Sequence, residues 1–385
     1  MRTSSIRTSA CLVALATAAF AGSSAGALGS TPVAGFTTVT CTDATTDAAA
    51  IQSAIDNSSA GSTIQIAGPT CLLTTGITLL GDRSYIGGAT GDETGTVLKQ
   101  DGTLPYLLAS DAYVQDSTTH TGDPLTVRSL SLQCSGTGST DGMIIESWDV
   151  NVVQVDVDGC GGSGIVDTSS NAAGQPLAPA ESGGTKPTSV NSRFENDFIT
   201  NSGQYGFAVL DTENVVTDGF LVDNQIANSG LDQVSMQTST GWNITGNHLY
   251  GDGHNAIVAD NMWATTIADN YIEDFDSAEA TGTYSGIVAQ ANGGNTSVIS
   301  GNKVFEWAKE ATGATYDFIK VTSLYGNATM VVDGNVVYGN GTAADVGFSY
   351  AGAGYTLGVT STGNSVQAVG NALTLGTGAT TSAGI

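Results

Sequence analysis

The sequence is poor in positive charge, and this excludes two classes of partner. It contains 10 Lys+Arg residues and three histidines against 36 Asp+Glu residues, so its net charge is −26 at pH 7. A negative field of this size repels the phosphates of nucleic acids and of anionic membranes. It also opposes a polyanionic sugar unless cations bridge the two, although solubility in an acidic or salty exterior alone explains most of the acidity. We therefore expect neither nucleic acid nor a membrane as a partner.

Long apolar runs are absent after the first residues, so no later segment is expected to cross a membrane. Residues 10–22 are apolar but too short to span a bilayer, and two arginines precede them. Together with the A-x-A pattern Ala25-Gly26-Ala27, they predict a cleaved signal peptide over 1–27 rather than a buried N-terminal helix. We expect one domain at 28–385, secreted outside the cell or into the periplasm.

Cysteine is scarce too, but its count is informative. Cys11 lies in the predicted signal peptide, and the other four cysteines of an exported chain predict two disulfides. Of the three pairings that four cysteines allow, we favour Cys41–Cys71 and Cys134–Cys160. The latter two are 26 residues apart (160 minus 134), about one period of the repeat described next. A metal site is the alternative, but the CxxC spacing that it needs is missing.

The chain is rich in glycine, with 51 residues, and in a repeated asparagine frame. Each frame places β-branched or apolar residues on both sides of a short polar corner, at intervals of 23 to 33 residues. The asparagines are Asn196, Asn224, Asn247, Asn270, Asn302, Asn335 and Asn364. A period of this size, with strand-like segments and turn residues, is typical of stacked coils that bury a core only together.

Residues 40–100 have the pattern of an opening module, before coils over 101–370. One face of a short helix collects the apolar residues Ala48, Ile51, Ala54 and Ile55. Thr46 or Asp47 would cap the start of that helix. A helix over the open end of a stacked sheet covers unpaired backbone groups and apolar core.

The run from Asp47 to Gly88 resembles the N-terminal module of exported proteins of the pectate lyase superfamily, and the asparagine frames resemble the asparagine ladder of their fold. This resemblance covers residues 40–370. It implies an all-β fold, a single-stranded right-handed parallel β-helix with an N-terminal capping helix. The superfamily includes lyases, hydrolases, epimerases, phage spikes and adhesins, so the resemblance does not decide the activity.

Counting back from each asparagine locates a strand whose second and fourth residues are apolar and should point inward. These pairs are Phe207/Val209, Val234/Met236, Ile257/Ala259, Ile287/Ala289, Ile319/Val321 and Phe348/Tyr350. In the resembled fold, the outward face of this sheet is the floor of a sugar-binding groove, and the exposed loop expected at 170–190 would be one wall of it.

The outward positions of these strands offer a polar strip. Gln237, Asp260 and Gln290 occupy the fifth position of three successive strands, with Ser235 at a third position. Neighbouring strands lie roughly 4.8 Å apart, so the two amides should flank the carboxylate. This arrangement is suited to hydrogen bonding with the hydroxyls of a sugar. An ordinary solvated face with polar ladders is the alternative.

Paired carboxylates would make the protein a glycoside hydrolase, which needs one protonated and one ionised carboxyl roughly 5–9.5 Å apart. Asp260 is the first candidate. Asp211, two coils away, or Asp232 and Asp317, from the turns before the strands, are its candidate partners. With 36 acidic residues, some such pair is also expected by chance.

A uronic-acid lyase or epimerase is the second hypothesis. It needs a base for the C5 proton, a cation to neutralise the uronate and an acid for the leaving group. Lys320 would be the cation, unless it forms a surface ion pair, and His254 with Tyr284 or Tyr316 would move protons. The arginines of pectate lyases are missing from these strands, and so are the paired aspartates and Gly-His-Gly of polygalacturonases.

Three further expectations concern ligands and assembly. Trp263 would stack on a sugar ring, unless it only packs at its turn. No cofactor is required, although Asp274, Asp276 and Glu279 offer Ca²⁺ the oxygen ligands that it prefers, with solvated turn acids as the alternative. The partner should be a polysaccharide and the protein a monomer. A non-catalytic glycan-binding or cell-surface protein is the third hypothesis.

Overall fold

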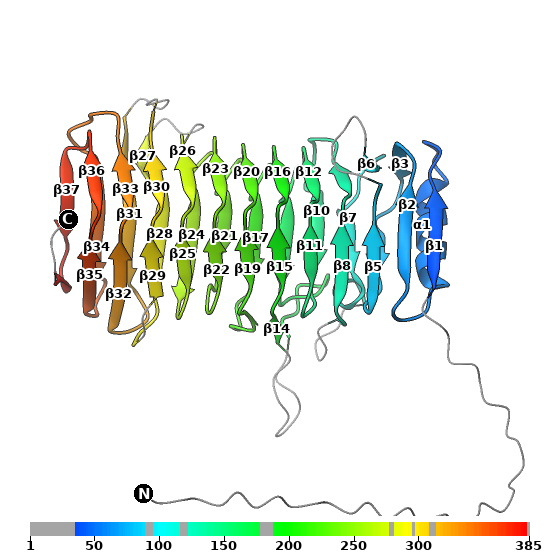
Figure 1. The fold of residues 1–385 in the computed structure, drawn as a ribbon, viewed down its shortest axis with the longest axis horizontal. Helices are drawn as coiled ribbons and strands as arrows, with labels where there is room; N and C mark the ends of the chain where they lie inside the picture. Colours follow the sequence, from blue (N-terminus) through cyan, green and yellow to red (C-terminus); the bar gives the residue numbers. More distant parts are fainter. Residues whose placement is uncertain are drawn as a thin grey trace, which may run out of the picture. The chain divides into compact units, whose positions relative to one another are not determined.

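The computed structural model describes residues 35–88, 95–115, 122–177, 188–276, 281–294, 297–307 and 313–382. The predicted signal peptide lies outside these ranges. Among the described residues, no helix is both long and apolar enough to cross a membrane. The described chain winds into stacked coils, and each coil contributes one strand to each of three parallel sheets (Figure 1).

Sheet A holds the second strand of each coil. It consists of β1 (Phe36–Thr40), β2 (Thr63–Ala67), β5 (Arg83–Ile86), β8 (Leu125–Arg128), β11 (Asn151–Val153), β15 (Arg193–Glu195), β19 (Phe220–Val222), β22 (Asn243–Thr245), β25 (Thr266–Ala268), β29 (Ser297–Ser300), β32 (Ala328–Asp333), β35 (Leu357–Thr362) and β38 (Ala379–Thr381).

Sheet B holds the third strand. It consists of β3 (Thr70–Leu73), β6 (Val97–Gln100), β9 (Ser131–Gln133), β12 (Asp156–Asp158), β16 (Phe198–Thr200), β20 (Gln225–Ala227), β23 (His248–Tyr250), β26 (Tyr271–Glu273), β30 (Lys303–Phe305), β33 (Val336–Tyr338) and β36 (Ser365–Gln367).

Sheet C holds the first strand of each coil, which is the strand that counting back from each asparagine located in the sequence. It consists of β4 (Ile77–Leu79), β7 (Tyr106–Ser110), β10 (Asp141–Ile145), β13 (Ile165–Thr168), β17 (Phe207–Leu210), β21 (Val234–Met236), β24 (Ile257–Met262), β28 (Ile287–Ala291), β31 (Ala314–Ser323), β34 (Val346–Gly352) and β37 (Asn371–Leu375). The short β27 (Gly282–Tyr284) also pairs with β31, and β14 (Ser189–Val190) pairs with β18 (Val216–Thr217).

The core is made of identical positions stacked from coil to coil. All predicted inward pairs of sheet C are buried, each residue with 0% or 1% exposure. In sheet B, Ile226, Leu249 and Ile272 lie directly opposite one another and are fully buried. Burial of each such aliphatic side chain contributes about 1.5–3 kcal/mol, and no single coil could obtain it alone. The predicted all-β, right-handed parallel β-helix is confirmed.

The turns between sheets A and B contain the predicted asparagine ladder. Asn247 donates from Nδ2 to Oδ1 of Asn270 at 2.9 Å, and the same bond links the ladder from Asn224 to Asn364. Before each ladder residue stands a residue in the left-handed region, such as Gly246 at φ 72°. Gly, Asp and Asn tolerate that conformation best, which explains the residue types of the repeated frame.

The first ladder position was assigned one residue too early. Asn196 itself has the left-handed φ of 57° and is exposed, so it takes the place of Gly246 in its own coil. Asp197 occupies the ladder, where its Oδ1 accepts from the Val155 amide and its own amide donates to Asn224. Its Oδ2 is buried without a hydrogen-bond partner.

Replacement of Asp197 by asparagine should therefore stabilise the protein at neutral pH. Burial raises the pKa of Asp197 well above its usual range. The contribution of the protonated carboxyl to the free energy of unfolding is therefore fully present below the pKa that Asp197 has in the unfolded chain, and it is lost as the pH rises through the pKa in the folded protein. An amide stays neutral, so we expect a gain of about 1–3 kcal/mol at pH 8 and almost none at pH 3. Urea unfolding at both pH values measures it, and an equal gain at both would contradict the ionisation argument.

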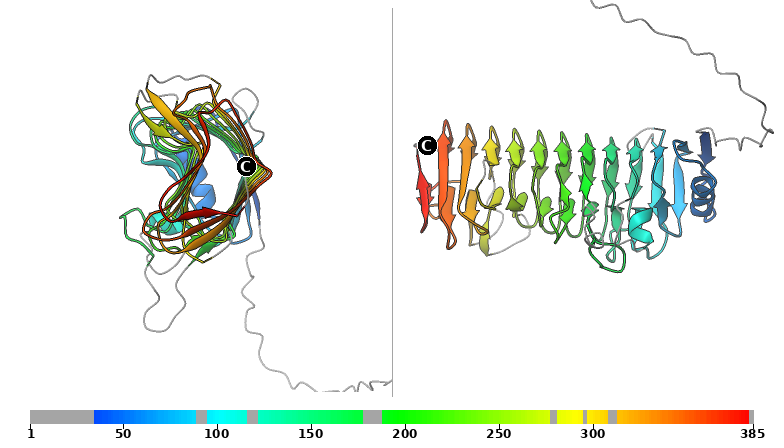
Figure 2. Two further views of the ribbon diagram at one scale, coloured as in Figure 1. Left: turned by 90° about the vertical axis from the view of Figure 1, so that its left-hand side faces the viewer. Right: turned by 90° about the horizontal axis from the view of Figure 1, so that it is seen from below.

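The N-terminal end of the stack is covered as predicted by α1 (Asp47–Asp56), which lies beside β1 in Figure 2. The predicted side-chain cap is absent, since Thr46 occupies the N-cap position without a side-chain hydrogen bond. The Asp47 carboxylate instead accepts from the amides of Ala44 and Leu72, and so ties the helix to β3.

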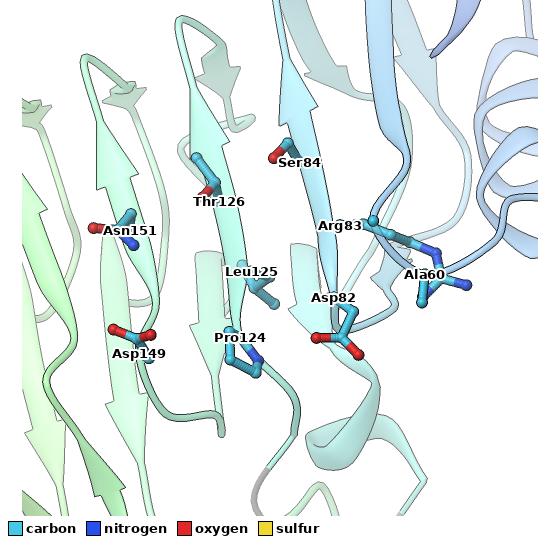
Figure 3. A pocket seen from close by; sticks show the side chains of 10 residues that line it. Ala60, Asp82, Arg83, Ser84, Pro124, Leu125, Thr126, Asp149 and Asn151 are labelled. Carbon is cyan, nitrogen blue, oxygen red and sulfur yellow. The ribbon is translucent and has the colours of Figure 1, made fainter. Parts of the chain in front are cut away.

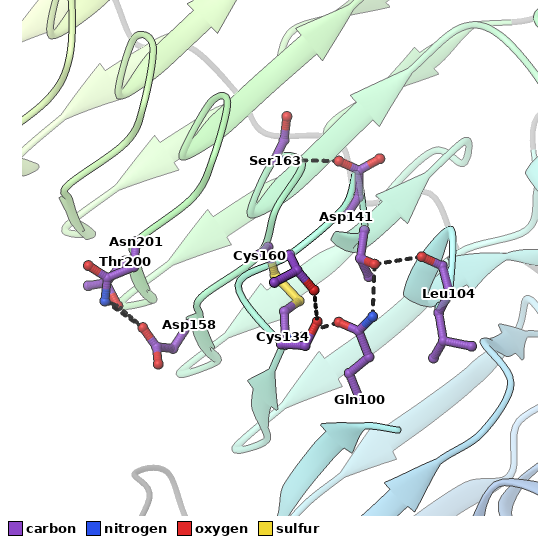
Figure 4. Close-up of a disulfide and its surroundings, with 12 residues drawn as sticks. Gln100, Leu104, Cys134, Asp141, Asp158, Cys160, Ser163, Thr200 and Asn201 are labelled. Carbon is purple, nitrogen blue, oxygen red and sulfur yellow. Dashed lines mark hydrogen bonds between the residues drawn. A yellow bond between two sulfur atoms is a disulfide. The ribbon is translucent and has the colours of Figure 1, made fainter. Parts of the chain in front are cut away.

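Both predicted disulfides are present. Cys41 pairs with Cys71 beside α1, and Cys134 pairs with Cys160 at the ends of β9 and β12, on neighbouring coils (Figure 4). Each bond closes a loop of about one coil, which typically contributes about 2–4 kcal/mol.

Candidate functional site

The outward face of sheet C presents the predicted polar strip near the C-terminal ends of its strands. Gln237 is exposed, and Asp260 and Gln290 are half-buried. The register between β24 and β28 shifts between Ala259 and Met262. This β-bulge changes the direction of the strand at the position of Asp260. We call Gln237, Asp260, Gln290 and Tyr325 the downstream group.

Asp260 is held by two hydrogen bonds. Its Oδ1 accepts from the Asn261 amide at 2.7 Å, and its Oδ2 accepts from the Tyr325 hydroxyl at 2.9 Å. Burial, the hydrogen bond to Asp260 and its negative charge all raise the pKa of Tyr325. The rings of Tyr325 and Trp263 are 48% and 43% exposed, enough to meet a sugar. Tyr325 lies 65 residues from Asp260 and was missed by sequence reasoning.

A hollow of about 320 Å³ continues the same face toward β10 and shares Gln237 with the downstream group. Ile144, Val166 and Leu210 form its apolar floor, and Tyr113 of the short helix α2 (Asp111–Val114) stands at its side. From the predicted wall at 170–190, Ser170 and Asn171 line the hollow, and residues 178–187 lie outside the described ranges.

Asp141 is a second residue that sequence reasoning missed. It begins β10, lines the hollow, and accepts a hydrogen bond from the Ser163 amide (Figure 4). Burial raises its pKa to about 6, against the opposing effect of that bond. Among the described residues that line the hollow it is the one carboxylic acid, so the hollow does not supply a carboxylate pair.

Five predicted residues lie in the turns before the strands of sheet C or on the strands themselves. They are Asp232, His254, Tyr284, Asp317 and Lys320, which we call the upstream group. Tyr284 stands opposite the buried Tyr316 and packs partly against the core, and Lys320 lies four residues further along the sheet, opposite Val288. The rings of His254 and Tyr284, on neighbouring coils, stack with centroids 6.2 Å apart, and the Tyr284 hydroxyl donates to the Thr281 carbonyl.

Asp232 sits beside His254 in the upstream group. Its Oδ1 accepts from both the amide and the side chain of Asn255 at 3.0 Å, so its orientation is set. Burial raises the pKa of Asp232, and the bonds from Asn255 and the charge of His254 oppose this.

Asp317 and Lys320 both belong to β31 and interact electrostatically. Burial raises the pKa of the Asp317 carboxyl, while Lys320 and a hydrogen bond from Ser349 lower it. Lys320 lies between Val288 and Ser349 of the adjacent strands, with its side chain half-buried. The upstream group therefore combines a cation, an imidazole next to a carboxylate, and a phenol.

The two groups are too far apart for the carboxylate pairs proposed from sequence. Asp232 lies one strand away from Asp260 and about five residues back along the strand, roughly 17 Å by strand geometry. Asp317 lies two strands away, roughly 19 Å. Paired carboxyls of glycosidases are separated by roughly 5–9.5 Å.

Two predicted site residues, Asp211 and Tyr316, are almost completely buried instead of exposed, and Asp232 is 9% exposed. Asp211 has 0% exposure, and its carboxylate accepts hydrogen bonds from Thr238 and from the amides of Glu213, Val215 and Val216. Its position after β17 faces inward, where it organises a turn. Tyr316, 1% exposed, packs edge-on against Phe275 in the core. Neither can contact a polysaccharide, so the site that we propose below contains neither.

The described residues do not gather a metal site, since no three of their His, Cys, Asp or Glu side chains could together hold an ion. Of the residues suggested for Ca²⁺, Asp276 is fully buried and Asp274 accepts from the Trp307 amide, while Glu279 lies outside the described ranges.

Another hollow, of about 340 Å³, lies beside β5, β8 and β11 of sheet A (Figure 3). Arg83 is its basic residue, but the guanidinium already donates to oxygens of Ser58 and Gly81. None of the predicted site residues lines it.

Comparison with known proteins shows the fold. No protein-family model and no curated protein matches the chain. The A-module of the Azotobacter vinelandii mannuronan C-5 epimerase AlgE6 is similar in structure, with a TM-score of 0.57 at 15% identity, covering 88% of this chain and 96% of that chain. The A-module of the Azotobacter vinelandii mannuronan C-5 epimerase AlgE4 has a TM-score of 0.56 at 15% identity, covering 87% of this chain and 95% of that chain. The DFA-IIIase from Arthrobacter chlorophenolicus A6 without its lid has a TM-score of 0.54 at 12% identity, covering 86% of each chain.

Proposed function

We propose that this protein is a carbohydrate-active enzyme that removes the C5 proton of a uronate residue in a polysaccharide bound along the outward face of sheet C. The observation that carries the proposal is the upstream group, in which His254 stacks on Tyr284 and lies beside Asp232, with Lys320 on β31 two coils from His254. The structural similarity to modules named as mannuronan C-5 epimerases agrees with a uronate substrate. The two disulfides suit an oxidising compartment, so we propose secretion.

The chemistry divides among the three side chains. The Lys320 ammonium lies against the uronate carboxylate and stabilises the negative charge that develops when C5 loses its proton. His254 accepts that proton, and the Asp232 carboxylate stabilises the resulting imidazolium. The Tyr284 hydroxyl then protonates the glycosidic oxygen as the C4–O bond breaks and C4=C5 forms. In an epimerase, Tyr284 instead returns a proton to C5 from the opposite face.

The remaining predicted residues would bind the polysaccharide without taking part in the reaction. Ser235, Gln237 and Gln290 would bond sugar hydroxyls, and Trp263 would stack on a neighbouring ring. Salt weakens the repulsion between the acidic protein and a polyanion, so physiological ionic strength favours binding.

A panel of polysaccharides tests the proposal. Polymannuronate, polyguluronate and polygalacturonate would be compared with a neutral mannan, with and without a calcium chelator. We expect ultraviolet absorbance of a C4=C5 product, or a changed C5 configuration by NMR, from a uronate polymer alone. New reducing ends without either signal would instead identify a glycoside hydrolase.

The Asp260→Asn variant separates these two hypotheses further. Asparagine keeps the shape and loses the charge, so we expect KM to rise about fivefold, from one weakened hydrogen bond, while kcat stays within about twofold. Asp101, exposed after β6, provides the control Asp101→Asn. A fall in kcat of about a hundredfold or more would make Asp260 an acid or base of a hydrolase.

A further inference from the structure

The outward face of sheet B carries an unusual concentration of rings. Two columns of side chains run across β23, β26, β30 and β33 in strict register. We call the six rings the aromatic face: His248, Tyr250, Tyr271, Phe305, Trp307 and Tyr338. This face belongs to a different sheet from the upstream and downstream groups and has no part in the chemistry proposed above.

The rings form one continuous surface. Tyr271 contacts Phe305 with centroids 5.6 Å apart, Phe305 contacts Trp307 at 5.1 Å, and Trp307 contacts Tyr338 at 5.4 Å. His248 extends the row, 4.9 Å from Tyr271. Trp307 is 54% exposed and Tyr338 is 37% exposed. Such exposure of large rings on one face marks an interaction site.

One carboxylate holds this surface in place. Glu273 Oε2 accepts from the Tyr271 hydroxyl at 2.7 Å and from Trp307 Nε1 at 3.1 Å, and Oε1 lies 3.0 Å from His248 Nε2. Burial raises the pKa of Glu273, but these bonds and the charge of His248 lower it by more. The rings are thus fixed before a partner arrives, which reduces the entropy lost on binding.

The chemistry of the face selects its occupant. Polar groups lie among the rings: Gln225 donates to the Tyr250 hydroxyl at 2.7 Å, and the exposed Lys303 stands beside Tyr271. An acyl membrane or an apolar helix would leave these groups unpaired, and the net charge of −26 opposes anionic lipids. A second copy of this face would bring two carboxylates and two acidic molecules together. A sugar ring offers both a flat C–H surface and hydroxyls.

We propose that the aromatic face is a binding site for an extended, neutral polysaccharide, whose pyranose rings stack on Trp307 and Tyr338. The repeat of the coils, roughly 4.8 Å, places successive rings along one line, as a linear chain requires. The face has the Glu273 carboxylate at its centre, which disfavours a polyuronate. The site would anchor the protein to a neutral polymer while sheet C acts on another.

Binding of the intact protein to soluble neutral polysaccharides tests this inference. Affinity electrophoresis and calorimetry would use a mannan, a xylan and hydroxyethyl cellulose, with polymannuronate as the charged comparator. We expect at least one neutral polymer to bind, with Trp307→Ala weakening it about tenfold or more and Trp307→Phe by less. Tyr355→Ala removes another exposed ring outside the aromatic face, 44% exposed against 54% for Trp307, and should leave binding unchanged.

Other outcomes would overturn the proposal. Failure of every neutral polymer to bind, or equal weakening by Tyr355→Ala, removes the face as a glycan site. Weakening by Lys320→Met would place the neutral polymer on sheet C instead. A dimer of the wild type in sedimentation that Trp307→Ala dissociates would identify a second copy as the occupant. Unchanged thermal unfolding of both variants excludes a folding defect.

Discussion

The His254→Asn variant should lose about 10²–10⁴-fold in kcat on a uronate polysaccharide, with KM nearly unchanged. Asparagine fills much of the space of imidazole but cannot accept the C5 proton, and general-base catalysis contributes rate factors of this size. The loss falls on kcat because the proton moves only in the reaction step. Initial rates of absorbance or of C5 exchange, measured over a range of polymer concentrations, give both constants.

Asp232→Asn provides the matched comparison. Asp232 stabilises the charged form of His254 without touching substrate, so its replacement should lower kcat by less than His254→Asn does. The double variant should then be no slower than His254→Asn alone, because Asp232 acts only through the imidazole. A His254→Asn protein that folds normally and retains its kcat would exclude His254 as the base.

Lys320→Met should reduce kcat/KM on uronate polymers by about 10²–10³-fold. Enzymes lose rate by about this factor when one preorganised group that stabilises developing negative charge is removed. The methionine keeps the length and packing of the lysine stem. The variant also removes the positive charge that opposes the raised pKa of Asp317, so that pKa should rise further. Chemical-shift titration of the Asp317 carboxyl reports the local effect independently of activity.

Lys99→Met is the control for total charge, because Lys99 is exposed on β6, away from sheet C. It should retain wild-type rates, and Lys320→Arg should retain part of the activity. Equal losses in Lys99→Met and Lys320→Met would mean that overall charge, and not a contact with the uronate, controls the reaction.

The fold could be predicted from sequence because the same signal recurs in successive coils from Phe207 onward. Apolar residues alternate on sheet C, and a residue that tolerates the left-handed region precedes each ladder asparagine. The first ladder position was wrong because the frame around Asn196 and Asp197 offers two polar residues. Attention to the left-handed position, filled by Gly or Asp before each of the other ladder asparagines, would have chosen Asp197.

The site was harder to predict because side-chain direction changes where a strand ends. Asp211 directly follows β17 and points into a turn. Tyr316 is buried because β31 begins at Ala314 and keeps its alternation through that residue. Tyr325 reaches Asp260 across 65 residues, a contact without a local signal. The aromatic face, by contrast, was visible at the first and third residues after the ladder asparagines, in "NHLY", "NYIE", "NKVF" and "NVVY".

The most direct test of proton removal at C5 is proton NMR of a uronate polymer incubated with the protein in D₂O. We predict loss of the H5 signal, accompanied either by the olefinic H4 signal of an unsaturated end or by deuterium at C5 of an inverted residue. His254→Asn should show neither change over the same time. New reducing ends with H5 fully retained would contradict C5 chemistry and assign the outward face of sheet C to glycosidic hydrolysis.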